Sequence, residues 1–66
     1  MEILVNNEPR QFEQALTVAE LLARLELTGQ RVAVEVNQDI VPKSRHAEFR
    51  LEGGERVEIV HAIGGG

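Results

Sequence analysis

The chain contains no cysteine, and that absence excludes disulfides, thiolate metal sites and thiol nucleophiles. It also lacks any apolar run near the roughly 20 residues that a membrane helix requires. The N-terminus has no basic region followed by a long apolar stretch, so no signal peptide is visible. We therefore expect a cytoplasmic protein that neither spans a membrane nor depends on thiol chemistry of its own.

Basic residues are in the minority, with seven Lys and Arg against eleven Asp and Glu and a formal net charge of -4. Nucleic-acid binding depends on neutralising phosphates with Lys and Arg, so this balance argues against it. A negative charge favours a partner with a basic docking surface. The simpler explanation of the charge taken alone is that it keeps a small domain soluble.

A chain of 66 residues forms one domain at most and has little volume left for a catalytic pocket once its core is filled. His46 and His61 are the only imidazoles, and a metal site would need more donors in a known spacing. We expect both to be surface or sheet-face side chains, with no metal bound. Ser44 has no evident base to activate it as a nucleophile.

Alternation of apolar and polar residues predicts five extended segments: Met1 to Val5, Arg10 to Glu13 with Phe12 turned inward, Val32 to Val36, Ile40 to Val41, and Arg56 to Ala62. Turn-forming residues separate several of them: Asn6 to Pro9, Asn37 to Asp39, and Glu52 to Glu55. Pro42 ends the fourth segment, and a short helical turn is expected from Ser44 to Phe49.

One main helix is predicted after Thr17. Thr17 and Glu20 have the spacing of a capping box, and an apolar stripe follows at helical spacing: Val18, Leu21, Leu22 and Leu25. Gly29 is the predicted stop. If the last strand pairs beside the first, the result is an α+β fold of the β-grasp type, with four to five strands in a mixed sheet and one covered face.

The chain ends with Ala62, Ile63 and three glycines directly after the last predicted strand. We expect a β-grasp domain over residues 1–63 and a thin, flexible tail over 64–66, because glycine has no side chain to pack. Glycine-rich ends are often inert linkers. Here the glycines follow the strand without a spacer, and no serine, proline or charge is mixed in.

A terminal carboxylate on Gly66 would be ionised at neutral pH. As an anion it can attack the α-phosphate of ATP to give an acyl-adenylate, which a persulfide, thiol or amine can then open. Gly64 and Gly65 would let the end thread into a narrow cleft. Since the chain has no thiol, any sulfur that it carries must be bonded to the acyl carbon of Gly66, as a thiocarboxylate.

The whole chain resembles the ThiS family of thiazole-biosynthesis sulfur carriers, which are ubiquitin-like β-grasp proteins ending in two glycines. The resemblance rests on the start Ile3 to Asn6, the helix entry Thr17 to Leu22, the run Val34 to Pro42, the turn Glu52 to Glu55, and Gly65-Gly66. Gly64 departs from the family, whose tails often have a small residue other than glycine, such as alanine, at that position.

The resemblance implies a reaction cycle in which the chain is a co-substrate and not the enzyme. An E1-like (ThiF-like) adenylating enzyme would activate Gly66 with ATP and magnesium, and a cysteine desulfurase relay would supply sulfur. The thiocarboxylate would then deliver sulfur to a ThiG-like thiazole synthase. No cofactor would be bound by the chain itself, and neither nucleic acid nor membrane would be a partner.

Four residues form a candidate docking patch for the activating enzyme: Val60, Ala62, Leu4 and Glu58, with Glu55 as a further acidic neighbour. A plain solvated strand face is the alternative reading of the same residues. Three other functions remain open at this point. They are a sulfur carrier for molybdopterin or another metabolite, a ubiquitin-like modifier of lysines, and an interaction module with an inert tail.

Overall fold

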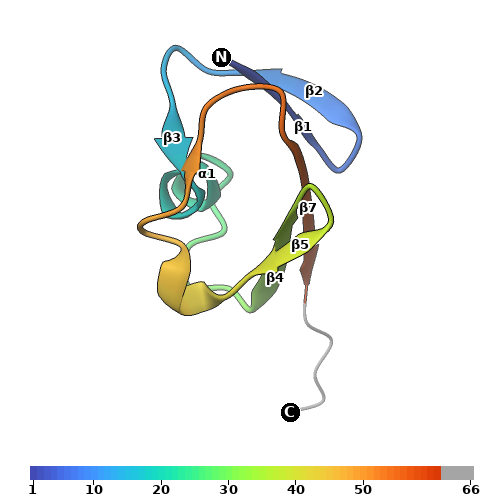
Figure 1. Ribbon diagram of the computed structural model, residues 1–66. Coiled ribbons are helices and arrows are strands. Elements are labelled where there is room, and N and C mark those ends of the chain that lie inside the picture. Colours follow the sequence, from blue (N-terminus) through green and yellow to red (C-terminus); the bar gives the residue numbers. More distant parts are fainter. Residues whose placement is uncertain (62–66) are drawn as a thin grey trace.

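The computed structural model describes residues 1–61 as a five-stranded sheet with one α-helix against it (Figure 1). The strand order is β2-β1-β7-β4-β5, with these bounds: β1 Glu2–Val5, β2 Glu8–Gln11, β4 Val32–Val36, β5 Asp39–Val41 and β7 Arg56–His61. β1 and β7 run parallel, and the other neighbours are antiparallel. This mixed sheet with one main helix confirms the predicted β-grasp fold.

One face of the sheet supplies more than half of a continuous apolar core, and the helix supplies much of the rest. The alternation that predicted the strands is the reason, since every second side chain points to the same face. The fully buried members are large aliphatic residues: Ile3, Val18, Leu21, Val34, Leu51 and Val57. Phe12 and Leu25 pack against this core while partly exposed. The opposite face of the sheet is left open.

Both hairpins turn on two residues with positive φ, as the tight turns that suit twisted strands require. Asn6 and Asn7 have φ of 50° and 70°, and Asn37 and Gln38 have φ of 52° and 72°. The predicted turns were therefore too long, and the second strand begins at Glu8 and not at Arg10. Pro9 is tolerated inside that strand because β2 is an edge of the sheet.

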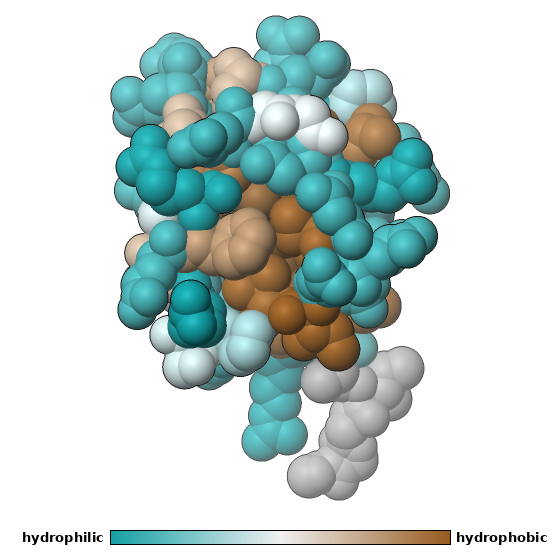
Figure 2. Space-filling view, in the orientation of Figure 1, coloured by the Kyte–Doolittle hydropathy of each residue, from teal (hydrophilic) through white to brown (hydrophobic). Residues whose placement is uncertain are grey.

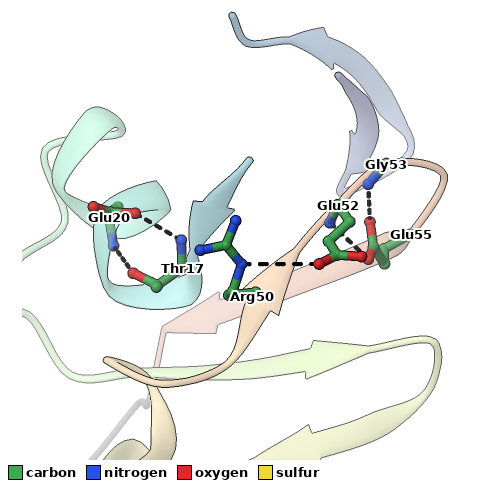
Figure 3. Close-up of polar contacts among 6 residues, drawn as sticks. All are labelled: Thr17, Glu20, Arg50, Glu52, Gly53 and Glu55. Atoms are coloured by element: carbon green, nitrogen blue, oxygen red, sulfur yellow. Dashed lines mark hydrogen bonds and ion pairs between the residues drawn. The ribbon is translucent and has the colours of Figure 1, made fainter. Parts of the chain in front are cut away.

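Helix α1 (Val18–Arg24) begins at the predicted capping box, which is confirmed. The Glu20 amide donates to Thr17 Oγ1 over 3.1 Å, and the Thr17 amide donates to Glu20 Oε1 over 2.8 Å (Figure 3). These two bonds satisfy backbone donors that a helix start leaves without partners.

The predicted stop at Gly29 is wrong, because the helix ends at Arg24. Glu26 adopts φ of 61°, and its amide donates to the carbonyl of Ala23 while the Leu27 amide donates to that of Leu22. This is a Schellman ending with a non-glycine residue in the left-handed position. Position 26 is not a glycine, so the sequence does not reveal that the helix ends there.

A second, two-stranded sheet joins β3 (Leu16–Thr17) to β6 (Arg50–Leu51) and was not predicted. Strands of two residues carry no measurable alternation. Between β5 and β6 lies a 3-10 helix, η1 (Lys43–Arg45), in place of the longer helical turn expected up to Phe49.

The turn from Glu52 to Glu55 is confirmed and is held by its own acidic side chain. The amides of Glu52 and Gly53 both donate to the Glu55 carboxylate, over 3.0 and 2.8 Å (Figure 3). Arg50 and Glu52 form an ion pair of 3.8 Å in the same region. Both side chains are largely exposed, so the pair adds little stability.

No helix among the described residues is long and apolar enough to cross a membrane. The predicted boundary between a domain over 1–63 and a tail over 64–66 lies outside residues 1–61, as does the last residue of the predicted final strand, Ala62.

Candidate functional site: the end of the last strand and the open sheet face

β7 leads to the C-terminal segment from the middle of the sheet. It is the third of five strands and is paired with β1 on one side and β4 on the other. A strand bonded on both sides opens only when its neighbours do. The first residues of β7, Arg56 and Val57, are therefore held on both sides, and its last described residues are paired with β4 alone.

Asn6 holds β7 beyond the point where β1 stops. The backbone pairing of β1 with β7 covers only Leu4 and Val5. The Ile59 amide then donates to Asn6 Oδ1 over 2.8 Å, and Asn6 Nδ2 donates to the Ile59 carbonyl over 3.2 Å. The side-chain amide of Asn6 thus replaces one further peptide unit of the β1 strand.

On its other side, β7 is paired with β4 up to its end. His61 lies opposite Val32, and the His61 ring contacts Gln30 Oε1 over 3.0 Å through Nε2. A carboxamide oxygen accepts, so Nε2 carries the proton in this contact. The pairing with Val32 and the contact with Gln30 thereby fix the position and direction of the backbone at His61.

The predicted docking residues within residues 1–61 lie on the open face but do not form one cluster. Val60 faces Ala33 across the β4–β7 pair, and its side chain remains 57% exposed. Leu4, half-buried, lies beside Arg56 on the other flank of β7. Arg56, which marks the position of Leu4, and Val60 are four residues apart along β7, or about 13 Å. Their contact with a partner stays a prediction.

Glu58 lies directly opposite Glu35 on the open face. Directly opposed like charges destabilise a sheet, so folding alone does not favour this pair. None of the ion pairs within residues 1–61 involves Glu35 or Glu58. Glu35 could not be singled out from the sequence, because its position opposite Glu58 depends on strand register.

Hydrophobic surface is also visible in the centre of the view in Figure 2, beside the β4–β5 hairpin. The large exposed hydrophobic side chains of residues 1–61 are Ile40, Phe49 and Val60. Ile40, at 70% exposure, lies opposite Glu35 on the open face. The acidic pair therefore has two apolar neighbours: Ile40 lies across from Glu35 on β5, and Val60 lies two residues after Glu58 on β7.

The two histidines have different environments. His61 is exposed, as expected. The expectation for His46 was wrong, because its side chain is buried and Nε2 donates to the carbonyl of Val41 over 3.0 Å. A single histidine outside any strand carries no periodicity from which burial can be deduced. Residues 1–61 hold no group of three or more side chains suited to a metal ion.

The residues to which the sequence assigned the chemistry are Gly64, Gly65 and Gly66, and these lie outside the described residues together with Ala62. Asn6 is the functional position that sequence reasoning missed. It was read only as a turn former, although a residue that ends one strand of a parallel pair can reach the neighbouring strand with its side chain.

Comparisons with known proteins agree with this geometry. The family model of the ThiS family matches residues 3–66. The sulfur carrier protein ThiS of Escherichia coli K12 is 33% identical over 66 residues, and the alignment covers all of both chains. A crystal structure of a thiamine biosynthesis protein (ThiS) from Geobacter metallireducens matches with a TM-score of 0.87 at 29% identity, again over the full length of both chains.

A longer relative also matches. The protein named thiazole synthase in Paramagnetospirillum magneticum is 44% identical over 66 residues, which is 100% of this chain and 20% of that protein. A thiazole synthase of Magnetococcus marinus shows the same coverage at 36% identity. The chain thus spans about one fifth of the length of the first curated relatives that it matches.

Proposed function

The chain belongs to the ThiS family, and we propose that it is a sulfur carrier of thiamin biosynthesis that bears sulfur on the C-terminal carboxyl group of Gly66. The observation that carries this proposal is the family match over residues 3–66, which includes the whole fold and the glycine end. The name of the E. coli relative, sulfur carrier protein ThiS, supports the role.

The proposed chemistry begins with the Gly66 carboxylate, which attacks the α-phosphorus of ATP and releases pyrophosphate. Magnesium, held with ATP in the activating enzyme, neutralises phosphate charge. A persulfide sulfur then attacks the acyl carbon and expels AMP. A second thiol cleaves the resulting acyl disulfide and is itself joined in a new disulfide, which frees the thiocarboxylate. The chain acts as a co-substrate throughout.

The chain's own contribution is to present this end. The Asn6 bonds to Ile59 and the Val32–His61 pairing fix β7 five residues before Gly66. Residues 62–66 can span about 17 Å when extended. Such a reach suits an active site that lies below a docked protein surface, and the absence of Cβ atoms at 64–66 leaves the acyl carbon unshielded.

The proposed partners follow from the same chemistry. An E1-like adenylating enzyme of the ThiF type activates the carboxylate, a cysteine desulfurase relay supplies sulfur, and a ThiG-like thiazole synthase receives it in the cytoplasm. The names of the longer relatives support the last partner. Val60, Glu58 and Leu4 on the open face are proposed to dock the activating enzyme, together with Ala62, which follows in the sequence after His61.

This proposal requires Gly66 to be the last residue of the working protein, whether it is encoded there or freed from a longer chain. The test is ATP–pyrophosphate exchange by a ThiF-type enzyme in the presence of the 66-residue chain. Exchange that depends on the chain supports the proposal. A variant lacking Gly65 and Gly66 is the control, and equal exchange with that variant would contradict it.

A further inference from the structure

A groove on the helix side of the sheet adjoins the end of β7, because its wall residue Val32 pairs with His61. It is distinct from the Glu35–Glu58 pair of the open face, since neither glutamate lines it. It has a volume of about 510 Å³ and lies between α1, the α1–β4 connection and the segment that follows η1. Its apolar wall residues come from these three parts and from the start of β4: Ala19, Leu22, Leu27, Val32, Ala33 and Ala47. The volume is in the range of about 300–1,000 Å³ that binding sites occupy.

The walls of the groove are fixed by backbone hydrogen bonds. The Ala19 amide donates to the His46 carbonyl over 2.9 Å, which ties the segment after η1 to the start of α1. The Leu27 amide donates to the Leu22 carbonyl over 2.8 Å and closes the other side. A ligand therefore meets a formed surface and does not have to order it, which favours binding.

The charge at the rim is opposite to that of the protein as a whole. Arg31 and Lys43 line the groove, and no Asp or Glu among residues 1–61 does. The ion pairs within residues 1–61 use Arg10, Arg45 and Arg50, and none of them involves Arg31 or Lys43. In a chain with a net charge of -4, this groove is therefore a local site for an anionic group.

His46 adds a directed polar contact to the apolar wall. Its Nε2 donates to the Val41 carbonyl, so in the neutral ring Nδ1 keeps its lone pair and can accept a hydrogen bond. The structure gives Nδ1 no partner among residues 1–61, and no buried polar side-chain atom there is left unsatisfied. His46 lines the groove, and we infer that an amide N–H of a bound segment donates to Nδ1.

We propose that this groove binds a segment of a partner protein that carries a bulky aliphatic side chain next to a carboxylate. The aliphatic group would fill the apolar space between Leu22 and Val32, and the carboxylate would pair with Arg31 and Lys43. A backbone amide of the segment would donate to His46. This site concerns binding alone and stands whether or not Gly66 carries sulfur.

The test is an NMR titration of the isotope-labelled 66-residue chain with an acetylated Glu-Leu-Leu-Glu peptide. We expect saturable amide shifts at Thr28, Gly29 and Ala47, with a dissociation constant in the millimolar range. Amides of Ile40 and Glu58 on the open face should not move. A Lys-Leu-Leu-Lys peptide keeps the aliphatic groups and reverses the charge, and its binding should be at least tenfold weaker.

Three variants complete the test. Arg31→Glu with Lys43→Glu should weaken binding of the acidic peptide at least tenfold, and Ala47→Trp should block the groove without a charge change. Arg10→Glu, in β2 at the far edge of the sheet, should leave binding unchanged. Unfolding curves check that each variant is folded. Equal binding by both peptides, or shifts of the Ile40 and Glu58 amides, would overturn the proposal.

Two other occupants would also overturn it. If deleting residues 62–66 moves the signals of Thr28 and Ala47 in the free protein, the chain fills the groove with its own end. If those signals depend on protein concentration, a second copy fills it.

Discussion

At the scale of single residues, Asn6 has two separate roles. Its backbone occupies the left-handed region in the β1–β2 turn, with φ of 50°. Its side chain bonds to both the amide and the carbonyl of Ile59, 53 positions away in the sequence. Glycine at the same position would keep the turn and lose only the side-chain bonds, so the two roles can be measured separately.

We expect Asn6→Gly to lower the free energy of unfolding by about 1–3 kcal/mol, because two partly buried hydrogen bonds are lost. Asn7→Gly is the matched control, since Asn7 also has positive φ, at 70°, and no side-chain bond to β7 is found for it. Urea unfolding measures both. Equal stability of the two variants would show that the Asn6 side chain contributes nothing.

His46 shows where residue-level prediction from sequence stops. A histidine in a sequence indicates a titratable or metal-binding group. The bond of His46 to the Val41 carbonyl depends on how η1 turns the chain back, and the segment after η1 contacts the start of α1 through the Ala19 amide. Asn6 presents the same difficulty, because a turn asparagine and a strand-bridging asparagine have the same sequence context. Both roles depend on which segments lie side by side.

At the scale of secondary-structure elements, the start of α1 could be predicted and its end could not. The start depends on two side chains at a fixed spacing, Thr17 and Glu20, which form both expected bonds. The end depends on Glu26 in a conformation that glycine favours, with φ of 61°. The sequence-based choice of Gly29 followed glycine preference, whereas tertiary packing of Leu25 and Leu27 sets the real end.

Replacing Glu26 by glycine should therefore stabilise the protein, by up to about 1 kcal/mol, because a left-handed backbone costs a non-glycine residue energy. Thermal unfolding measures the change as a higher midpoint. Ala23→Gly, in the exposed last turn of the same helix, should have the opposite sign and cost about 0.5–1 kcal/mol. A lower midpoint for Glu26→Gly would contradict the proposed source of strain.

The capping box offers a second test at this scale. Thr17→Ala removes the acceptor for the Glu20 amide and should cost about 1 kcal/mol of unfolding free energy. Glu20→Gln is the conservative control, because a glutamine can also bond to the Thr17 amide. Chemical denaturation of both variants gives the comparison, and an unchanged midpoint for Thr17→Ala would refute the role of the cap.

At the scale of the whole molecule, charge is distributed unevenly between two faces. The open face carries the Glu35–Glu58 pair beside Ile40 and Val60, and the groove on the helix side carries Arg31 and Lys43. Strand alternation predicted the open face and the placement of Val60 and Glu58 on it. It could not predict the groove, which forms only when α1, its following loop and the segment after η1 come together.

The acidic pair should accelerate association with a basic partner surface. We expect Glu58→Lys to slow association with the activating enzyme by roughly tenfold at low salt, with a smaller effect at high salt because exposed charges are screened. Glu13→Lys makes the same change in net charge beyond β2, and its effect should be smaller. Stopped-flow kinetics measures the rates, and equal rates for both variants would exclude docking through Glu58.

The central claim is that the chain carries sulfur on the acyl carbon of Gly66, and intact mass spectrometry tests it most directly. The chain is incubated with a ThiF-type enzyme, ATP, magnesium and a persulfide donor. We predict a mass increase equal to the replacement of one oxygen by sulfur, located in the C-terminal fragment and absent when Gly65 and Gly66 are deleted. An unchanged mass in the presence of an activating enzyme that adenylates its own carrier would contradict the account.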